Sequence, residues 1–148
     1  MLGTEIHHLR FPIRDVSVPE NVSSVKELIG QIQGILEEDK RNKVYIHCWG
    51  GVGRTGVIVG CLLSHQHDFD YEKTMDALKK AFSDCPKSAY RETPETKEQR
   101  EFIEKYAEEM KQEMLGQQAL LMWKMGAGNS AKRFNGEDPI PAKTKVRG

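Results

Sequence analysis

The decapeptide HCWGGVGRTG, residues 47–56, lies between two apolar segments and decides how the chain folds around it. Before it stands the short β-prone run KVYI, residues 43–46, and after it the apolar run VIVGCLL, residues 57–63. The apolar run alone fits either strand or helix. We expect a helix, because a glycine-rich turn after a strand commonly opens one and a helix start offers unpaired N–H groups with partial positive charge. The stretch therefore predicts an anion-binding loop.

The residues of this loop suit phosphoryl chemistry. Donors around Cys48 would stabilise its thiolate, and in such surroundings the pKa of a cysteine falls to roughly 3.5–7.5. Gly50, Gly51 and Gly53 allow positive φ and can turn successive N–H groups inward around phosphate oxygens. Arg54 can then offer its planar fork to two oxygens of the same group. These residues predict a nucleophile held inside an anion cradle.

The other side chains of the loop have predicted roles as well. The Thr55 hydroxyl can donate to the sulfur and make it a better leaving group, while His47 steadies the loop backbone. Trp49 and Val52 complete the predicted substrate-binding surface. The alternative is an ordinary glycine turn with a structural cysteine, because a bare Cys-x5-Arg spacing is weak evidence.

The whole string resembles the His-Cys-x5-Arg-Thr/Ser signature of the cysteine-dependent protein tyrosine and dual-specificity phosphatases. The resemblance covers about residues 5–110 and is closest over Gly-Val-Gly-Arg-Thr-Gly. Trp49-Gly50 replaces the Ser-Ala pair common in tyrosine-specific members. The resemblance implies a phosphatase that forms a phosphocysteine intermediate, with no metal and no other cofactor.

A loop between Pro12 and Pro19 contains Asp15, which lies 33 residues before Cys48. In the resembling phosphatases a loop Asp some thirty residues ahead of the nucleophile protonates the leaving group, a role that suits a carboxylic acid. The Trp-Pro that precedes this Asp in tyrosine-specific enzymes is missing, which favours the dual-specificity branch. An isolated loop Asp is otherwise a turn or capping residue.

A second matching pattern is Pro94-x-Thr96-x-x-Gln99-x-x-Phe102. In the resembling family it begins a helix, and its Gln can help to position the water that hydrolyses phosphocysteine. From the residues alone, Thr96 and Gln99 form a capping box for the last helix. Both roles remain open for Gln99.

We expect an α/β fold in which helices flank a parallel-sheet core. Predicted strands at 5–11 and 43–47 enclose a helix that a capping box at Ser24 begins and that runs to about Glu38. A right-handed crossover then places Asp15 and Cys48 at one sheet edge. Further helices are expected at about 55–66, at 71–82 after the cap Asp70, and after Thr96.

Two strands are few for a parallel sheet, and the resembling phosphatases have further N-terminal strands. Three explanations stay open. A second copy or another partner chain completes the sheet edge, the natural start lies upstream of Met1, or the fold is minimal.

Composition limits the remaining possibilities. We expect a catalytic domain over residues 1–125 and a disordered, mildly basic tail over 126–148. The 22 Lys and Arg balance 22 Asp and Glu, which argues against a nucleic-acid partner. No signal-peptide pattern opens the chain and no apolar run approaches the ~20 residues that span a bilayer, so we expect no membrane partner. The 3 cysteines favour a reducing, cytoplasmic setting.

Other histidines and cysteines have ordinary interpretations. The pair His7-His8 is expected on the surface or in packing, and His65 and His67 at a helix end, rather than in a metal site. Of the two remaining cysteines, Cys61 is expected in the core and Cys85 in a loop, with a redox partner for Cys48 as the alternative.

Phosphorylated proteins are the first expected substrates, because the loop lacks the extra lysines expected of inositol-phosphate enzymes. An inositol or other small phosphomonoester is the next candidate. A phosphate-binding pseudophosphatase or regulatory module is the main alternative from another class. Sulfur transfer is disfavoured, since it needs neither Asp15 nor the Arg54-Thr55 pair.

Overall fold

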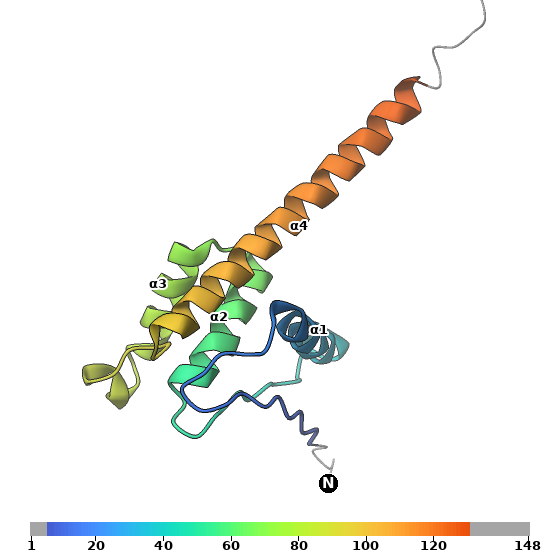
Figure 1. Cartoon of the computed structure of the whole chain (residues 1–148). Coiled ribbons are helices and arrows are strands. Elements are labelled where there is room, and N and C mark those ends of the chain that lie inside the picture. Colours follow the sequence, from blue (N-terminus) through green and yellow to red (C-terminus); the bar gives the residue numbers. More distant parts are fainter. Residues whose placement is uncertain (1–5, 131–148) are drawn as a thin grey trace, which may run out of the picture. The chain divides into compact units, whose positions relative to one another are not determined.

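The computed structural model describes residues 6–130, and within this range the chain is built from helices joined by loops (Figure 1). The elements are α1 (Val22–Glu38), α2 (Gly53–His67), α3 (Tyr71–Phe82), the 3-10 helix η1 (Pro86–Ala89) and α4 (Lys97–Ser130). The chain divides into two compact units, Met1–Glu113 and Met114–Gly148, so the last helix contributes to both.

The predicted parallel sheet is wrong, because no residue between 6 and 130 forms a strand. The segment 42–48 forms no regular secondary structure, and it alternates half-buried residues such as Val44 and Ile46 with exposed ones such as Tyr45. The other predicted strand is largely exposed, with Ile6 86% and Leu9 47% accessible. Burial that alternates every two residues is typical of a segment with one buried face. A strand also needs a neighbouring strand for its backbone hydrogen bonds.

The helices follow the sequence closely, because their start signals are local. α3 has the predicted bounds, and the Asp70 carboxylate accepts the N–H of Lys73 at 2.9 Å as its N-cap. α1 ends at Glu38 as expected but begins earlier than predicted, since Asn21 is its N-cap and accepts the N–H of Ser24 at 2.8 Å. The predicted capping box at Ser24 is therefore wrong.

The core of the first unit surrounds α2, which packs against α1 and α3. Ile29 of α1 and Val57 of α2 are fully buried there, as are Ile103 and Tyr106 of α4. A β-carbon on Gly60 would lie 2.6 Å from the Ile103 side chain, so the glycine allows a close approach between α2 and α4. This packing fixes the N-terminus of α2, where the predicted loop lies.

The second unit begins within α4. The helix continues to Ser130, past Gly126 where the predicted tail begins, and residues 131–148 of that tail lie outside the described residues. The boundary of the predicted catalytic domain at residue 125 stays a prediction. No helix within residues 6–130 combines the length and the hydropathy needed to cross a bilayer.

Candidate active site

The thiol of Cys48 faces the backbone of the glycine-rich loop just ahead of α2. The N–H of Gly51 donates to Sγ at 3.2 Å. Partial burial raises the pKa of the Cys48 thiol, but the nearby Thr55 hydroxyl and the N–H groups of Thr55, Gly51 and Gly50 outweigh burial and lower the pKa to about 7. A large fraction of this sulfur is therefore thiolate at neutral pH.

Of the donor groups around this sulfur, the Thr55 hydroxyl lowers the pKa of the thiol most. Its oxygen is buried and has no aligned hydrogen-bond partner. A buried donor without an acceptor is unfavourable, and a negative sulfur beside it would supply that acceptor. The environment thus favours the thiolate over the thiol.

Two glycines of the loop are required for different reasons. Gly51 has a φ of +69°, which side chains rarely adopt. Gly53 instead needs to be small, because a β-carbon there would lie 3.0 Å from the Gln99 amide and 3.1 Å from the Glu95 carboxylate. Positive φ was predicted for Gly50, Gly51 and Gly53, but only Gly51 has it.

Arg54 and Asp15 lie next to each other in the structure. One Nη of Arg54 lies 2.9 Å from the Asp15 carboxylate, and the other donates to the carbonyl of Ile13 at 3.4 Å. Asp15 is 77% exposed, whereas Arg54 is 24% exposed. The carboxyl group therefore lies at the mouth of the site beside a more enclosed guanidinium.

A tight turn presents Asp15. The N–H of Ser17 donates to the carbonyl of Arg14 at 3.1 Å, and Val16 inside the turn has a φ of +59°. A β-branched residue in this left-handed region is strained, and glycine would be the ordinary choice at such a position. The turn therefore holds the acid in a conformation that the sequence does not favour locally.

Gln99 has the capping role that the sequence left open. Its N–H donates to the Thr96 hydroxyl at 3.2 Å, and its Oε1 accepts the N–H of Thr96 at 3.2 Å, which completes a capping box for α4. Oε1 also accepts the N–H of Glu95 at 3.0 Å, and Nε2 donates to the carbonyl of Ser17 at 3.0 Å. Gln99 is fully buried and joins the start of α4 to the turn that presents Asp15.

Sequence reasoning missed the residues that hold the loop from outside. Lys87 donates its Nζ to the carbonyl of Gly50 at 2.6 Å, and the Thr93 hydroxyl donates to the carbonyl of Val52 at 2.8 Å. Arg91 forms an ion pair with Glu95 at the rim. These residues follow the loop by about forty positions in the chain, and no spacing or motif marks them.

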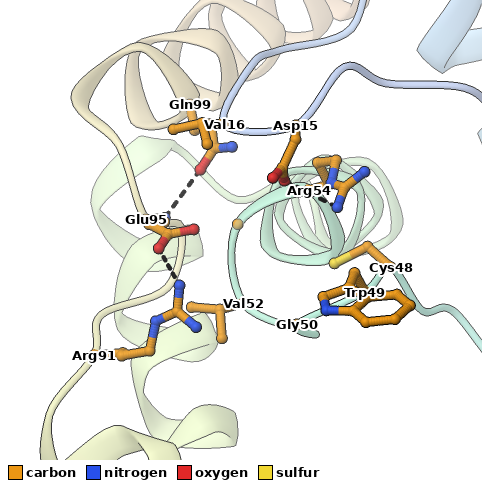
Figure 2. Close-up of a pocket in the computed structure, with 11 residues that line it drawn as sticks. Asp15, Val16, Cys48, Trp49, Gly50, Val52, Arg54, Arg91, Glu95 and Gln99 are labelled. Atoms are coloured by element: carbon orange, nitrogen blue, oxygen red, sulfur yellow. Dashed lines mark hydrogen bonds and ion pairs between the residues drawn. The ribbon is translucent and has the colours of Figure 1, made fainter.

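A pocket of about 210 Å³ collects these groups, as Figure 2 shows. Arg91 and Glu95 lie across the loop from Cys48 and Trp49. The pocket is lined by Asp15, Val16, Cys48, Trp49, Gly50, Val52, Gly53, Arg54, Arg91, Glu95 and Gln99. Trp49 is 97% exposed, so its indole is available to a ligand at the mouth.

The remaining predicted residues lie outside this pocket lining. His47 is exposed and stacks on Tyr45, with ring centroids 5.3 Å apart, so its support of the loop stays a prediction. Cys61 is fully buried, and burial raises the pKa of its thiol, whereas Cys85 is half-buried; both are free. His65 lies in the last turn of α2, with Nδ1 3.1 Å from the Tyr106 hydroxyl.

The pKa of Cys48 can be tested by its alkylation rate. Iodoacetamide labelling, followed by mass spectrometry of the Cys48 peptide, should rise with pH through a midpoint near 7. Thr55→Val removes the hydroxyl and should raise the midpoint by about one pH unit, while Thr55→Ser should leave it nearly unchanged. Cys85 supplies an internal reference. Equal midpoints for the Val and Ser variants would refute the role given to the hydroxyl.

Comparison with known proteins agrees with this geometry. Residues 1–114 match the family model described as the DSP-PTPase phosphatase domain of Swiss Army Knife proteins, PTP-SAK. Protein 197R of Invertebrate iridescent virus 6, provisionally named a tyrosine phosphatase, is 38% identical over 72 residues, which are 46% of this chain and 26% of that protein. The tyrosine-protein phosphatase CDC14 homolog of Schizosaccharomyces pombe is 39% identical over 64 residues, 43% of this chain and 11% of that protein.

A third relative is the phosphatidylinositol 3,4,5-trisphosphate 3-phosphatase cnrN of Dictyostelium discoideum, 34% identical over 76 residues, which are 51% of this chain and 11% of that protein. The chain thus covers less than half the length of each of these relatives. No solved structure matches it. Because the family model covers most of the chain, including the thiol, the arginine and the acid turn, the chain belongs to the dual-specificity and protein tyrosine phosphatase family.

Proposed function

We propose that this chain hydrolyses phosphomonoesters of tyrosine and of serine or threonine in proteins, through a phosphocysteine intermediate and without a metal ion. The observation that carries the proposal is the Cys48 sulfur, whose pKa of about 7 makes it a nucleophile at neutral pH. Arg54 and Asp15 line the same pocket. A thiolate nucleophile also suits the reducing, cytoplasmic setting that the sequence predicts.

In the first step the Cys48 thiolate attacks phosphorus in line with the ester oxygen. The S–P bond forms as the P–O bond to the leaving group breaks, and Asp15 gives its proton to the departing oxygen. The loop N–H groups and the Arg54 guanidinium stabilise charge on the three other oxygens. The contact of 2.9 Å between Arg54 and Asp15 supports this assignment, because it puts the acid beside the group that would hold the phosphoryl oxygens.

In the second step water attacks phosphorus and the S–P bond breaks. The electron pair returns to sulfur, where the buried Thr55 hydroxyl can stabilise it, and the Asp15 carboxylate takes the proton of the water. Both polar atoms of the Gln99 side chain are already hydrogen-bonded to the backbone. We therefore assign Gln99 a positioning role, holding the Asp15 turn, in place of a direct contact with the water.

The pocket favours phosphorylated side chains of proteins over inositol phosphates. Arg54 is the only Lys or Arg within residues 47–56, and Lys87 is committed to the carbonyl of Gly50. Arg91, which also lines the pocket, is paired with Glu95. Inositol phosphates carry several anionic groups that would need further cations. The exposed Trp49 indole instead offers an apolar surface beside the thiol.

Turnover of an aryl phosphate tests the mechanism. Wild-type protein should hydrolyse p-nitrophenyl phosphate equally with and without EDTA. Cys48→Ser should abolish turnover, and Asp15→Asn should lower kcat by about 10²-fold or more, since general acid catalysis contributes that much. A folded wild-type protein that binds vanadate but shows no Cys48-dependent turnover would contradict the enzyme and support a phosphate-binding module.

The role of Trp49 predicts a substrate preference. Trp49→Ala should lower kcat/KM for a phosphotyrosine peptide by about 3–10-fold, because stacking of an indole on an aromatic ring is lost. For the same peptide carrying phosphoserine, kcat/KM should change by less than about twofold, because phosphoserine has no aromatic ring. Tyr45→Ala is the control, because Tyr45 is also a largely exposed aromatic residue but does not line the pocket. Equal losses on both peptides would refute the assignment.

A further inference from the structure

The part of α4 that belongs to the second unit exposes many large apolar side chains. We call residues 114–125 the distal segment. Within it Leu115 is 48% exposed, Met122 74% and Trp123 69%. Leu120, Leu121 and Met125 are also at least half exposed, at 51%, 60% and 75%. Such a concentration of exposed apolar side chains within one short segment of a helix indicates an interaction site rather than scattered surface residues.

The apolar side chains occupy a broad arc of this helix. At roughly 100° per residue, Leu115 and Met122 lie on one side, seven residues apart, and Gln117 and Lys124 lie on the other. Leu120 and Leu121 flank that polar stripe on its two edges. Gln118 is a polar residue within the apolar arc, between Met125 and Met122. The seam that pairs two helices in a coiled coil is a narrow stripe, and this arc is much wider. The pattern therefore fits a broad apolar surface better than a second copy of the helix.

The charge of the region changes at the start of the distal segment. Residues 97–113 contain six acidic side chains, the last of which is Glu113, and no further Asp or Glu follows until Glu137. The same acid-free stretch contains Lys124, Lys132 and Arg133. An apolar helix whose charged residues between positions 114 and 136 are all basic is complementary to an apolar surface that carries negative charge.

We propose that the distal segment binds the surface of anionic phospholipid bilayers. Its apolar arc would enter the boundary between headgroups and acyl chains, with Trp123 at the interface and Lys124 at the anionic headgroups. The segment is already helical within α4, so binding does not require the helix to form. The segment would lie on the bilayer surface. This partner departs from the sequence-based expectation of no membrane contact, which rested on spanning length and on the missing signal-peptide pattern.

Vesicle binding by the full chain tests the proposal. The chain has 2 Trp residues, so in a Trp49→Phe background the emission reports Trp123 alone. Emission should shift to the blue, and the protein should sediment with vesicles that contain phosphatidylglycerol, more strongly than with phosphatidylcholine alone. Lys124→Gln should weaken binding to the anionic vesicles by about fivefold at low salt, as expected for one cation near a charged surface.

Two charge-matched variants locate the binding face. Met122→Glu and Gln117→Glu add the same charge to the same helix, about 140° apart around its axis. Met122→Glu should weaken vesicle binding by roughly tenfold or more, and Gln117→Glu by clearly less. Equal loss in both variants, or no binding by the parent, would overturn the proposal. A doubled mass in light scattering that Met122→Glu abolishes, without vesicle binding, would make the face a self-association surface instead.

Discussion

The site depends on the contact between the Cys48 sulfur and the N–H groups that turn towards it at the start of α2. Those amides face inward only if the neighbouring carbonyls face outward, and two distant side chains hold them there. Lys87 binds the carbonyl of Gly50, and Thr93 binds the carbonyl of Val52. The loop is thus fixed from both sides: the Thr55 hydroxyl and the loop amides lower the pKa of the thiol to about 7, and two loop carbonyls accept hydrogen bonds from Lys87 and Thr93.

The acid turn is connected to this loop through α4. Gln99 caps the helix, reaches the carbonyl of Ser17 behind the Asp15 turn, and lies against the backbone of Gly53. The buried Gln99 amide therefore connects the Asp15 turn, the glycine-rich loop and the start of α4. The positive φ of Val16 is maintained within that framework, which is the usual circumstance in which local strain persists.

Local signals in the sequence were sufficient to predict most helices and the glycine-rich loop. The Asp70 cap, the Thr96–Gln99 box and the glycine-rich string each depend on residues within a few positions of one another. The predicted sheet was wrong for the opposite reason: the β-prone run 43–46 is a local pattern, whereas strand pairing is a relation between distant segments that no local pattern contains. Lys87 and Thr93 were missed for the same reason, since their hydrogen bonds to the loop carbonyls join segments about forty residues apart.

The most direct test of the account is to trap the intermediate. Protein mixed with p-nitrophenyl phosphate and quenched in acid within milliseconds should carry one phosphoryl group, and peptide mapping should place it on Cys48. The adduct should be absent from Cys48→Ser and should persist longer in Asp15→Asn, where the base for the second step is missing. Phosphate release without an adduct on Cys48, or an adduct on another residue, would contradict the nucleophilic role of this thiolate.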